Sequence, residues 1–249
     1  MSGHALTELQ SEILIVPSAP EYVAQMEDLM HAAYGTSREN PDEIFTEAMF
    51  LHHIATFPEG QYVALDGERV IGLTVSMRIH YDPAQPILES WWSIAGDGWL
   101  RHAPDGEWMY GVESVVHPDY RAQGVGGKLM EARFDTARAL NLRGMVAGSA
   151  IVSYSQVADH VSVTEYVQGV VEGRYFDTNL SKQIKKGFRP GPLIPNYLTD
   201  VDSCGWGVSI IWDNADYQPQ SPMMAHVQPR RYQFARRVPY ASTGRSAAL

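Results

Sequence analysis

The stretch that decides the fold is residues 113–128, Glu-Ser-Val-Val-His-Pro-Asp-Tyr-Arg-Ala-Gln-Gly-Val-Gly-Gly-Lys. Its first residues complete a run rich in aromatic and β-branched side chains over residues 108–116, which predicts a β-strand. Pro118 ends that strand, and apolar residues at helical spacing predict a helix over residues 126–140. The segment between them is therefore a glycine-rich loop that leads from a strand into the first turn of a helix.

Such a loop is, in physical terms, an anion-binding site. The N–H groups in the first turn of a helix have no intrahelical partners, and the helix dipole adds partial positive charge there. Gly124, Gly126 and Gly127 let a bulky diphosphate approach the backbone, and Arg121 and Lys128 can supply charge at its edge. We therefore expect the loop to bind a diphosphate.

Two other phosphate-binding loops do not fit the spacing. A dinucleotide-binding loop reads Gly-x-Gly-x-x-Gly and follows the first strand of its domain. Here the spacing is Arg-x-x-Gly-x-Gly, and the loop lies mid-chain after a predicted hairpin. A P-loop requires Ser or Thr after its lysine, whereas Leu129 follows Lys128.

Outward from this loop, the pattern predicts one α/β domain over residues 12–213, between a leader at 1–11 and an irregular, basic tail at 214–249. Insertions are expected near 82–107 and 153–177. The other predicted strands are 12–16, 61–65, 69–79, 143–151 and 206–212. The other predicted helices begin at residue 18 or 20 and after residue 40, with Pro41 in the first turn, and lie at 164–172 and 178–186.

Composition narrows the class of function. The chain has 249 residues, of which 45% are hydrophobic and 19% charged, as in ordinary globular proteins. The formal net charge of -10 opposes general nucleic-acid binding, which requires a basic surface. Residues 1–10 lack the apolar segment of a signal peptide, and no run approaches the ~20 apolar residues of a membrane span. We therefore expect a cytoplasmic protein that binds neither nucleic acid nor membrane.

The histidines and the cysteine predict no metal centre. His52 and His53 are adjacent, and adjacent residues do not share a helix face. Neither His-Glu-x-x-His nor Cys-x-x-Cys occurs. Cys204 is the single cysteine, so it cannot form an internal disulfide, which also favours a cytoplasmic setting.

The glycine loop in this context resembles the GNAT acyltransferase superfamily. The resemblance rests on residues 121–126, Arg-Ala-Gln-Gly-Val-Gly, on the Val-Val-His-Pro-Asp-Tyr before them, and on Lys186-Gly187-Phe188. It implies a GNAT fold of the α/β (α+β) class, with a mixed, mostly antiparallel central sheet that is splayed at the acyl-CoA site and flanked by helices. Other segments resemble the GNAT domain that some bacterial proteins carry fused to a carbon-nitrogen hydrolase: Gly96-Asp97-Gly98-Trp99, Tyr166-x-x-Gly169 and Pro195-Asn196-Tyr197-Leu198.

The resemblance implies that acetyl-CoA is the co-substrate and that its pantetheine lies along residues 108–116. Backbone groups of Ser114, Val115 and Val116 would pair with the pantetheine amides, and the N–H of Val115 or Val116 would hold the thioester carbonyl. Glu113 is the candidate general base; a glutamate satisfied by a neighbouring arginine or amide is the alternative. The residues implied to hold the pyrophosphate are Arg121, Gln123, Gly124, Val125, Gly126, Gly127 and Lys128.

One position departs from the family pattern. A tyrosine often stands four residues before the glycine of the Gly-Phe pair and acts as the acid for the departing thiolate, but this chain has Gln183 there. The acid therefore stays open among Tyr175, Asn179 and Ser181. His117 is expected to face solvent.

The acceptor is expected to be an amine or another small molecule, and a homodimer stays open. The candidate substrate-binding residues, from the two insertions, are Trp99, Tyr166 and Tyr175. Packing is the alternative role for these side chains. Three functions remain: an N-acetyltransferase, an acyl-CoA-binding module without turnover, and a transferase that uses a different acyl-CoA.

Overall fold

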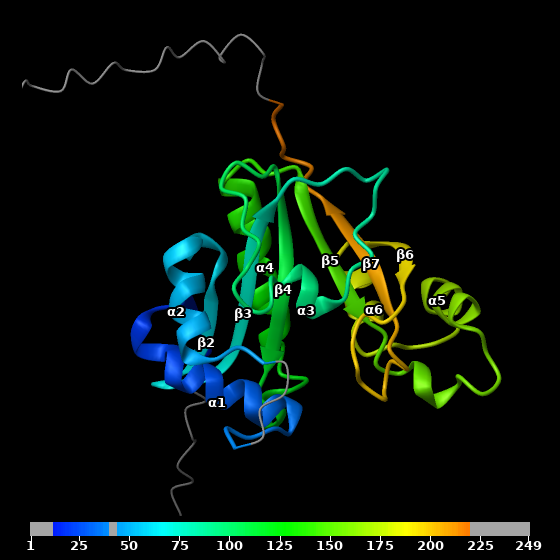
Figure 1. Ribbon diagram of the computed structural model, residues 1–249, viewed down its shortest axis with the longest axis horizontal. Coiled ribbons are helices and arrows are strands. Elements are labelled where there is room, and N and C mark those ends of the chain that lie inside the picture. Colours follow the sequence, from blue (N-terminus) through cyan, green and yellow to red (C-terminus); the bar gives the residue numbers. More distant parts are fainter. Residues whose placement is uncertain (1–11, 40–43, 220–249) are drawn as a thin grey trace, which may run out of the picture. The chain divides into compact units, whose positions relative to one another are not determined.

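A computed structural model describes residues 12–39 and 44–219 (Figure 1). The helices and strands are β1 (Leu14–Pro17), α1 (Val23–Tyr34), α2 (Glu47–Thr56), β2 (Tyr62–Asp66), β3 (Arg69–Ile79), α3 (Trp91–Ile94), β4 (Trp108–Val116), α4 (Val125–Ala139), β5 (Gly144–Ala150), α5 (Val163–Val171), α6 (Leu180–Lys185), β6 (Arg189–Ile194) and β7 (Gly207–Asp213). The chain divides into two units, residues 1–217 and residues 218–249, and these helices and strands all lie in the first. The predicted leader and most of the predicted tail lie outside the described residues.

The seven strands form one sheet in the order β1-β2-β3-β4-β5-β7-β6. All neighbouring strands run antiparallel except β4 and β5, which are parallel. Helix α4 packs on β2, β3 and β4, and α1 packs on β3 and β4 (Figure 1). The predicted mixed, mostly antiparallel sheet flanked by helices is confirmed.

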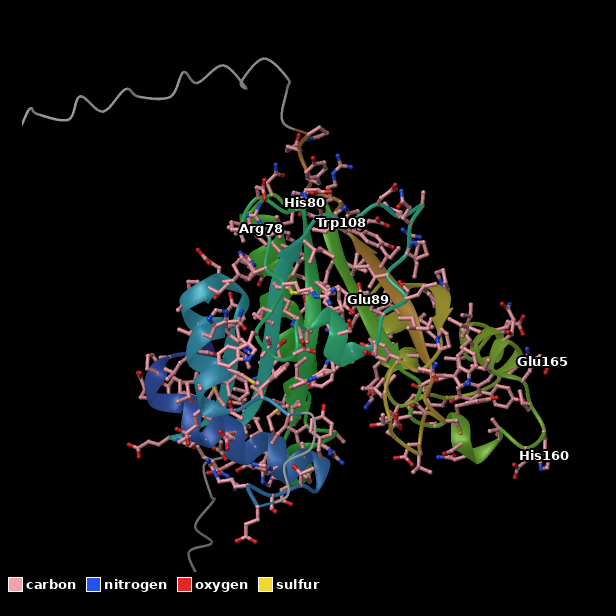
Figure 2. All side chains as sticks on the ribbon, viewed as in Figure 1. Arg78, His80, Glu89, Trp108, His160 and Glu165 are labelled. Carbon is pink, nitrogen blue, oxygen red and sulfur yellow. The ribbon has the colours of Figure 1, made fainter. Side chains whose placement is uncertain are left out.

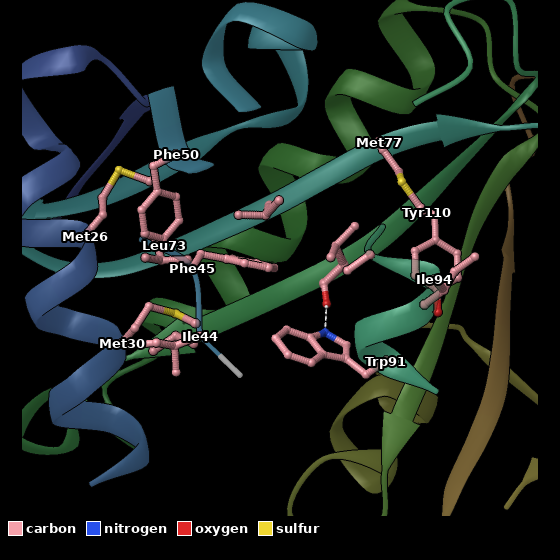
Figure 3. Packing of buried hydrophobic residues seen from close by; sticks show 14 of the residues in the cluster. Met26, Met30, Ile44, Phe45, Phe50, Leu73, Met77, Trp91, Ile94 and Tyr110 are labelled. Atoms are coloured by element: carbon pink, nitrogen blue, oxygen red, sulfur yellow. Dashed lines mark hydrogen bonds between the residues drawn. The ribbon is translucent and has the colours of Figure 1, made fainter. Parts of the chain in front are cut away.

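The largest hydrophobic cluster joins the sheet to α1, α2 and the 82–107 insertion. Figure 3 shows Met26, Phe45, Phe50, Leu73 and Trp91 in this cluster. Trp91 is 7% exposed, and its indole N–H donates to the carbonyl of Val112 at 2.8 Å. Burial of this tryptophan ties the insertion to the middle of β4, so the insertion is anchored on the core at that point.

The start of helix α2 was predicted wrongly, and strand β6 was not predicted. Helix α2 begins at Glu47, later than predicted, because Thr46 caps it by accepting from the N–H of Met49, while Ile44 and Phe45 are buried in a segment without regular secondary structure. The predicted first turn around Pro41 lies outside the described residues.

Strand β6 was not predicted, because its Arg-Pro-Gly-Pro sequence reads as a loop. It is tolerated as a strand because β6 is the edge of the sheet, where proline removes no needed donor.

His53 makes the stability of this region dependent on pH. Its side chain is 1% exposed, Nε2 donates to the carbonyl of Gly98 at 2.7 Å, and Nδ1 has no hydrogen-bond partner. Burial lowers the pKa of His53 to about 4, with a smaller contribution from His52. In the unfolded chain, His53 binds this proton near its ordinary pKa of about 6.5. The contribution of neutral His53 to the free energy of unfolding is therefore complete above about pH 6.5, and it is lost as the pH falls towards 4.

We expect the free energy of unfolding to fall by about 2–3 kcal/mol between pH 7 and pH 4.5 through His53. Urea unfolding of the wild-type protein and of His53→Gln at both pH values measures the difference in this dependence. His160→Gln, at an exposed histidine of the 153–177 segment, is the control and should keep the wild-type dependence. An equal pH dependence in wild type and His53→Gln would contradict the assignment.

Candidate functional site

The sheet parts between β4 and β5. Strand β4 pairs with β3 along its whole length, from Val116 opposite Gly72 to Trp108 opposite Ile79. It pairs with β5 at three positions only, the last being Gly111 opposite Ala147. Beyond that pair β5 continues with β7, so residues 112–116 have a strand neighbour on one side only. The predicted splay of the sheet lies at this point.

A β-bulge in β4 coincides with the parting. Val75 pairs with Glu113 and Ser76 with Gly111, which leaves Val112 as the extra residue. A bulge disrupts the ladder of backbone hydrogen bonds, so its carbonyl groups need other donors. Side chains supply them: Trp91 donates to the carbonyl of Val112, while Arg133 and the hydroxyl of Thr74 (2.9 Å) donate to that of Glu113.

The Glu113 carboxylate lies at the bulge, partly exposed. One oxygen accepts from the hydroxyl of Tyr34 at 3.0 Å, and the other accepts from the N–H of Ser114 at 2.7 Å. None of the ion pairs in the described part of the chain includes Glu113. Desolvation raises the pKa of Glu113, and the Ser114 N–H, the Tyr34 hydroxyl and the charge of Arg133 oppose that rise. A carboxylate with a raised pKa is suited to accept a proton near neutral pH.

The glycine loop adopts the conformation that its sequence requires. A single 3-10 turn at Pro118–Tyr120 follows β4, and Ala122 and Gly124 have φ angles of 62° and 82°, in the left-handed region. His117 caps that turn by accepting from the N–H of Asp119 at 3.2 Å, and its other ring nitrogen contacts Arg69 at 3.0 Å. Its side chain is only 17% exposed, so the expectation that His117 faces solvent was wrong.

Open space lies beside the first turn of α4. A Cβ atom added to Gly124 would meet nothing within 4 Å, and one added to Gly126 would meet only Val116, at 3.7 Å. Val125 is 1% exposed, so its side chain packs beneath the loop and only its backbone can serve a ligand. The loop therefore places open space beside the first turn of a helix, whose N–H groups have no intrahelical partners, and its role as an anion site stays a prediction.

The charged and polar side chains around the loop have other partners. Arg121 donates to the carbonyl of Ala33 at 3.4 Å, and the Gln123 amide to that of Asp119 at 2.9 Å. Lys128 donates to the carbonyl of Ile13 at 3.2 Å. Lys186, the C-cap residue of α6, to which no role was predicted, would lie 3.8 Å from a Cβ on Gly127 and pairs with Glu131 at 2.6 Å. Lys186 thus flanks the loop from the C-terminal end of a second helix.

Within the described residues, none of the three candidate substrate residues forms a hydrogen bond, ion pair or ring contact with Glu113. Tyr166 is 2% exposed and its hydroxyl donates to Asp177 at 3.0 Å, so the structure gives it a packing role. Tyr175 stacks on Tyr166 and borders a surface pocket of about 350 Å³ between α5 and α6. Trp99 is 46% exposed and contacts His52 of α2 edge-on. Their role in substrate binding stays a prediction.

Figure 2 shows labelled residues of the two predicted insertions and of the start of β4. His160 and Glu165, at the α5 end of the 153–177 segment, lie well apart from Trp108 at the start of β4 and from Glu89 in the 82–107 insertion. Of the two predicted insertions, the 82–107 insertion reaches the bulge, because the indole N–H of Trp91 donates to the carbonyl of Val112 in β4.

Sequence reasoning missed two tyrosines, one that contacts Glu113 and one that lies at the parting of β4 and β5. Tyr34 ends α1, 79 residues earlier in the chain, and no local pattern shows that it reaches Glu113. Tyr197 is 3% exposed and donates to the carbonyl of Gly148, one residue beyond the last β4–β5 pair. Burial and the neighbouring Tyr110 phenol raise the pKa of Tyr197, with a smaller effect of Glu113. A resemblance had drawn attention to residues 195–198, but gave them no role.

Two further observations concern the described residues only. No group of three or more His, Cys, Asp and Glu side chains there is arranged to hold a metal ion. No helix in residues 12–39 or 44–219 combines the length and apolar character that crossing a membrane requires.

A mixed sheet that parts beside a glycine loop, with a carboxylate at the parting, defines the GNAT class of acyltransferase folds. Residues 23–156 match the model of the Acetyltransferase (GNAT) family, and the chain belongs to this family. It is 33% identical over 183 residues to the uncharacterized N-acetyltransferase YkwB of Bacillus subtilis (strain 168), covering 73% of this chain and 80% of YkwB.

A second relative has the additional length expected of a fusion. The chain is 38% identical over 172 residues to the probable hydrolase YhcX of Bacillus subtilis (strain 168), a match that covers 68% of this chain and 33% of YhcX. The chain thus spans about a third of the length of that relative. The resemblance to a GNAT domain that accompanies a hydrolase is confirmed at the level of the family.

Solved structures share the fold at low sequence identity. The GNAT-like decarboxylase GphF, in complex with isobutyryl-CoA, has a TM-score of 0.67 and 24% identity, over 81% of this chain and 99% of that one. The putative acetyltransferase yncA of Salmonella typhimurium, with its cofactor acetyl-CoA, has a TM-score of 0.53 and 15% identity, over 84% and 98%. Both support the fold, and both of those proteins bind an acyl-CoA.

Proposed function

We propose that this protein transfers an acyl group, most simply acetyl, from acyl-CoA to an amine acceptor by direct attack, with Glu113 as the general base. The observation that carries the proposal is the Glu113 carboxylate at the bulge of β4. It is free of ion pairs within the described residues and lies where β4 has lost β5 as a neighbour. The glycine loop that would hold the pyrophosphate begins a few residues later on the same segment.

In this proposal, groups of the chain act on the proton of the amine, on the oxyanion and on the departing sulfur. Glu113 takes the proton that the acceptor amine loses as its nitrogen bonds to the thioester carbon. The N–H of Val115 or Val116 holds the oxyanion, a contribution of about 3–4 kcal/mol for one well-placed donor. The carbon–sulfur bond then breaks, and the amide N–H₂ of Gln183 is available to hydrogen-bond the sulfur in place of the family tyrosine.

Two alternatives stay within the same fold. A module that binds acyl-CoA without turnover fits the glutamine at position 183, which cannot act as an acid as a phenol does. A transferase for a larger acyl group fits the similarity in fold to a protein whose structure holds isobutyryl-CoA. Glu113 favours the enzyme over the binding module, because binding alone does not require a carboxylate at the bulge.

Calorimetric titration of the purified protein with acetyl-CoA, followed by release of free CoA thiol in the presence of a panel of small amines, tests the proposal. We expect micromolar binding, about −8 kcal/mol, and amine-dependent thiol release. Binding without thiol release for any amine would favour the module. Binding of isobutyryl-CoA but not acetyl-CoA would favour a different donor, and binding of neither would refute the proposal.

A further inference from the structure

Arg133 is a buried cation without a carboxylate partner. It lies on α4, and its side chain is 3% exposed. It belongs to none of the ion pairs found within residues 12–39 and 44–219, and its Nε atom has no hydrogen-bond partner. Burial of a guanidinium group costs several kcal/mol unless its surroundings compensate. The position therefore needs an explanation beyond packing.

The groups that Arg133 does bind belong to the bulge. Its Nη2 atom donates to the carbonyl of Val75 at 2.8 Å and also to the carbonyl of Glu113. These two residues are register partners on β3 and β4, on the side of the bulge that carries the carboxylate. A Cβ atom on Gly111, across the bulge, would lie 3.3 Å from Nη1. One guanidinium group thus spans the place where the ladder is disrupted.

From these contacts we infer that Arg133 is a positioning residue that fixes the bulge in β4 and thereby sets the place and charge of Glu113. This inference rests on the proposed function only in calling Glu113 the base. Because Arg133 holds the carbonyl of Glu113, it determines where the carboxylate meets Tyr34 and where the next N–H points. Arg133 acts through the backbone of Glu113 and touches no reacting atom, so it is not itself catalytic.

The charge of Arg133 gives the inference a spectroscopic signature. Its positive charge stabilises the ionised form of Glu113 and so opposes the desolvation that raises the pKa of that carboxyl. Among the described residues, the other titratable group that contacts the Glu113 carboxylate is Tyr34 from α1; Arg121 acts on the charge of Tyr34, and Glu113 acts at longer range on Tyr197. Loss of the cation must therefore raise the pKa of Glu113, whereas loss of packing alone need not.

Carbon-13 NMR of protein labelled at the glutamate carboxyls measures this directly, with Glu113→Gln to assign the signal. Arg133→Gln keeps a side-chain donor but removes the charge, and we expect the titration of Glu113 to move to higher pH. Arg133→Lys keeps the charge and should leave the midpoint nearer that of the wild type. Arg138→Gln, an exposed arginine on the same helix, is the matched control and should leave it unchanged.

Turnover supplies the second readout. We expect Arg133→Gln to slow acyl transfer by about 10- to 100-fold, since a displacement of about 1 Å can have that effect, and to shift the acid limb of the pH profile upwards. A folded Arg133→Gln with an unchanged Glu113 titration would overturn the inference. The NMR titration needs no substrate, so it stands even if acyl transfer fails. Should Arg133→Gln not fold, Arg133→Lys carries the test: a folded Arg133→Lys protein whose Glu113 titration moves well away from the wild-type midpoint, although the charge is kept, would overturn the inference instead.

Discussion

Glu113→Gln is expected to lower the rate of acyl transfer by about 10²–10⁴-fold, the usual contribution of a positioned general base. Glutamine has the shape of glutamate, and its amide oxygen can still accept from either Tyr34 or Ser114, the two donors that hold the carboxylate. What is lost is the ability to take a proton from the acceptor amine. The affinity for acetyl-CoA should stay within about twofold of wild type, because the glycine loop is untouched. Calorimetry and thiol release on the same preparation give both numbers.

The pH profile adds a test that the rate alone does not supply. Since the base must be ionised, turnover of the wild-type protein should rise with pH through the raised pKa of Glu113, and this limb should be absent in Glu113→Gln. Glu89→Gln is the control, because Glu89 is a carboxylate of the 82–107 insertion that pairs with Arg101 at 2.9 Å. Wild-type turnover in Glu113→Gln would remove Glu113 as the base and leave the family assignment intact.

The elements that sequence predicted best are those whose signals are local. Strands β3 and β4 have the predicted bounds, because both are long runs of β-branched and aromatic residues that end at a turn or a proline. The start of α4 was predicted within one residue, since the glycines mark both the loop and the helix N-terminus. Strand β6 was missed because its prolines are compatible with a strand only at a sheet edge, and edge position is a property of the whole sheet.

Sequence reasoning found the candidate-site residues that lie on one continuous segment and missed those that reach Glu113 from other elements. Glu113 and the glycine loop lie on one continuous segment, so a motif finds them together. Tyr34 and Arg133 reach Glu113 from α1 and α4, and in sequence each reads as an ordinary exposed helix residue. Tyr166 shows the converse difficulty, because an aromatic residue in an insertion suggests a pocket, whereas its phenol is buried on Asp177 and its role in substrate binding stays a prediction.

Gly124→Glu is expected to weaken acetyl-CoA binding by about 100-fold or more, which corresponds to about 3 kcal/mol. The new side chain would enter the open space beside the first turn of α4, where the diphosphate is proposed to lie. Its carboxylate would compete for the helix N–H groups and repel the phosphate charges. The protein should stay folded, since a Cβ at this position meets nothing within 4 Å.

Backbone strain must be separated from this effect, because Gly124 has a φ of +82° that any other residue adopts at a cost of about 1–2 kcal/mol. Gly67→Glu is the matched control: Gly67 lies in the β2–β3 turn at φ +59°, also with nothing within 4 Å of a Cβ. It introduces the same charge and the same kind of strain outside residues 121–128. Calorimetry should show wild-type affinity for Gly67→Glu and, for Gly124→Ala, only a modest loss. Equal affinities in Gly124→Glu and Gly67→Glu would mean that the acyl-CoA does not lie on this loop, and the diphosphate site would have to be sought elsewhere on the fold.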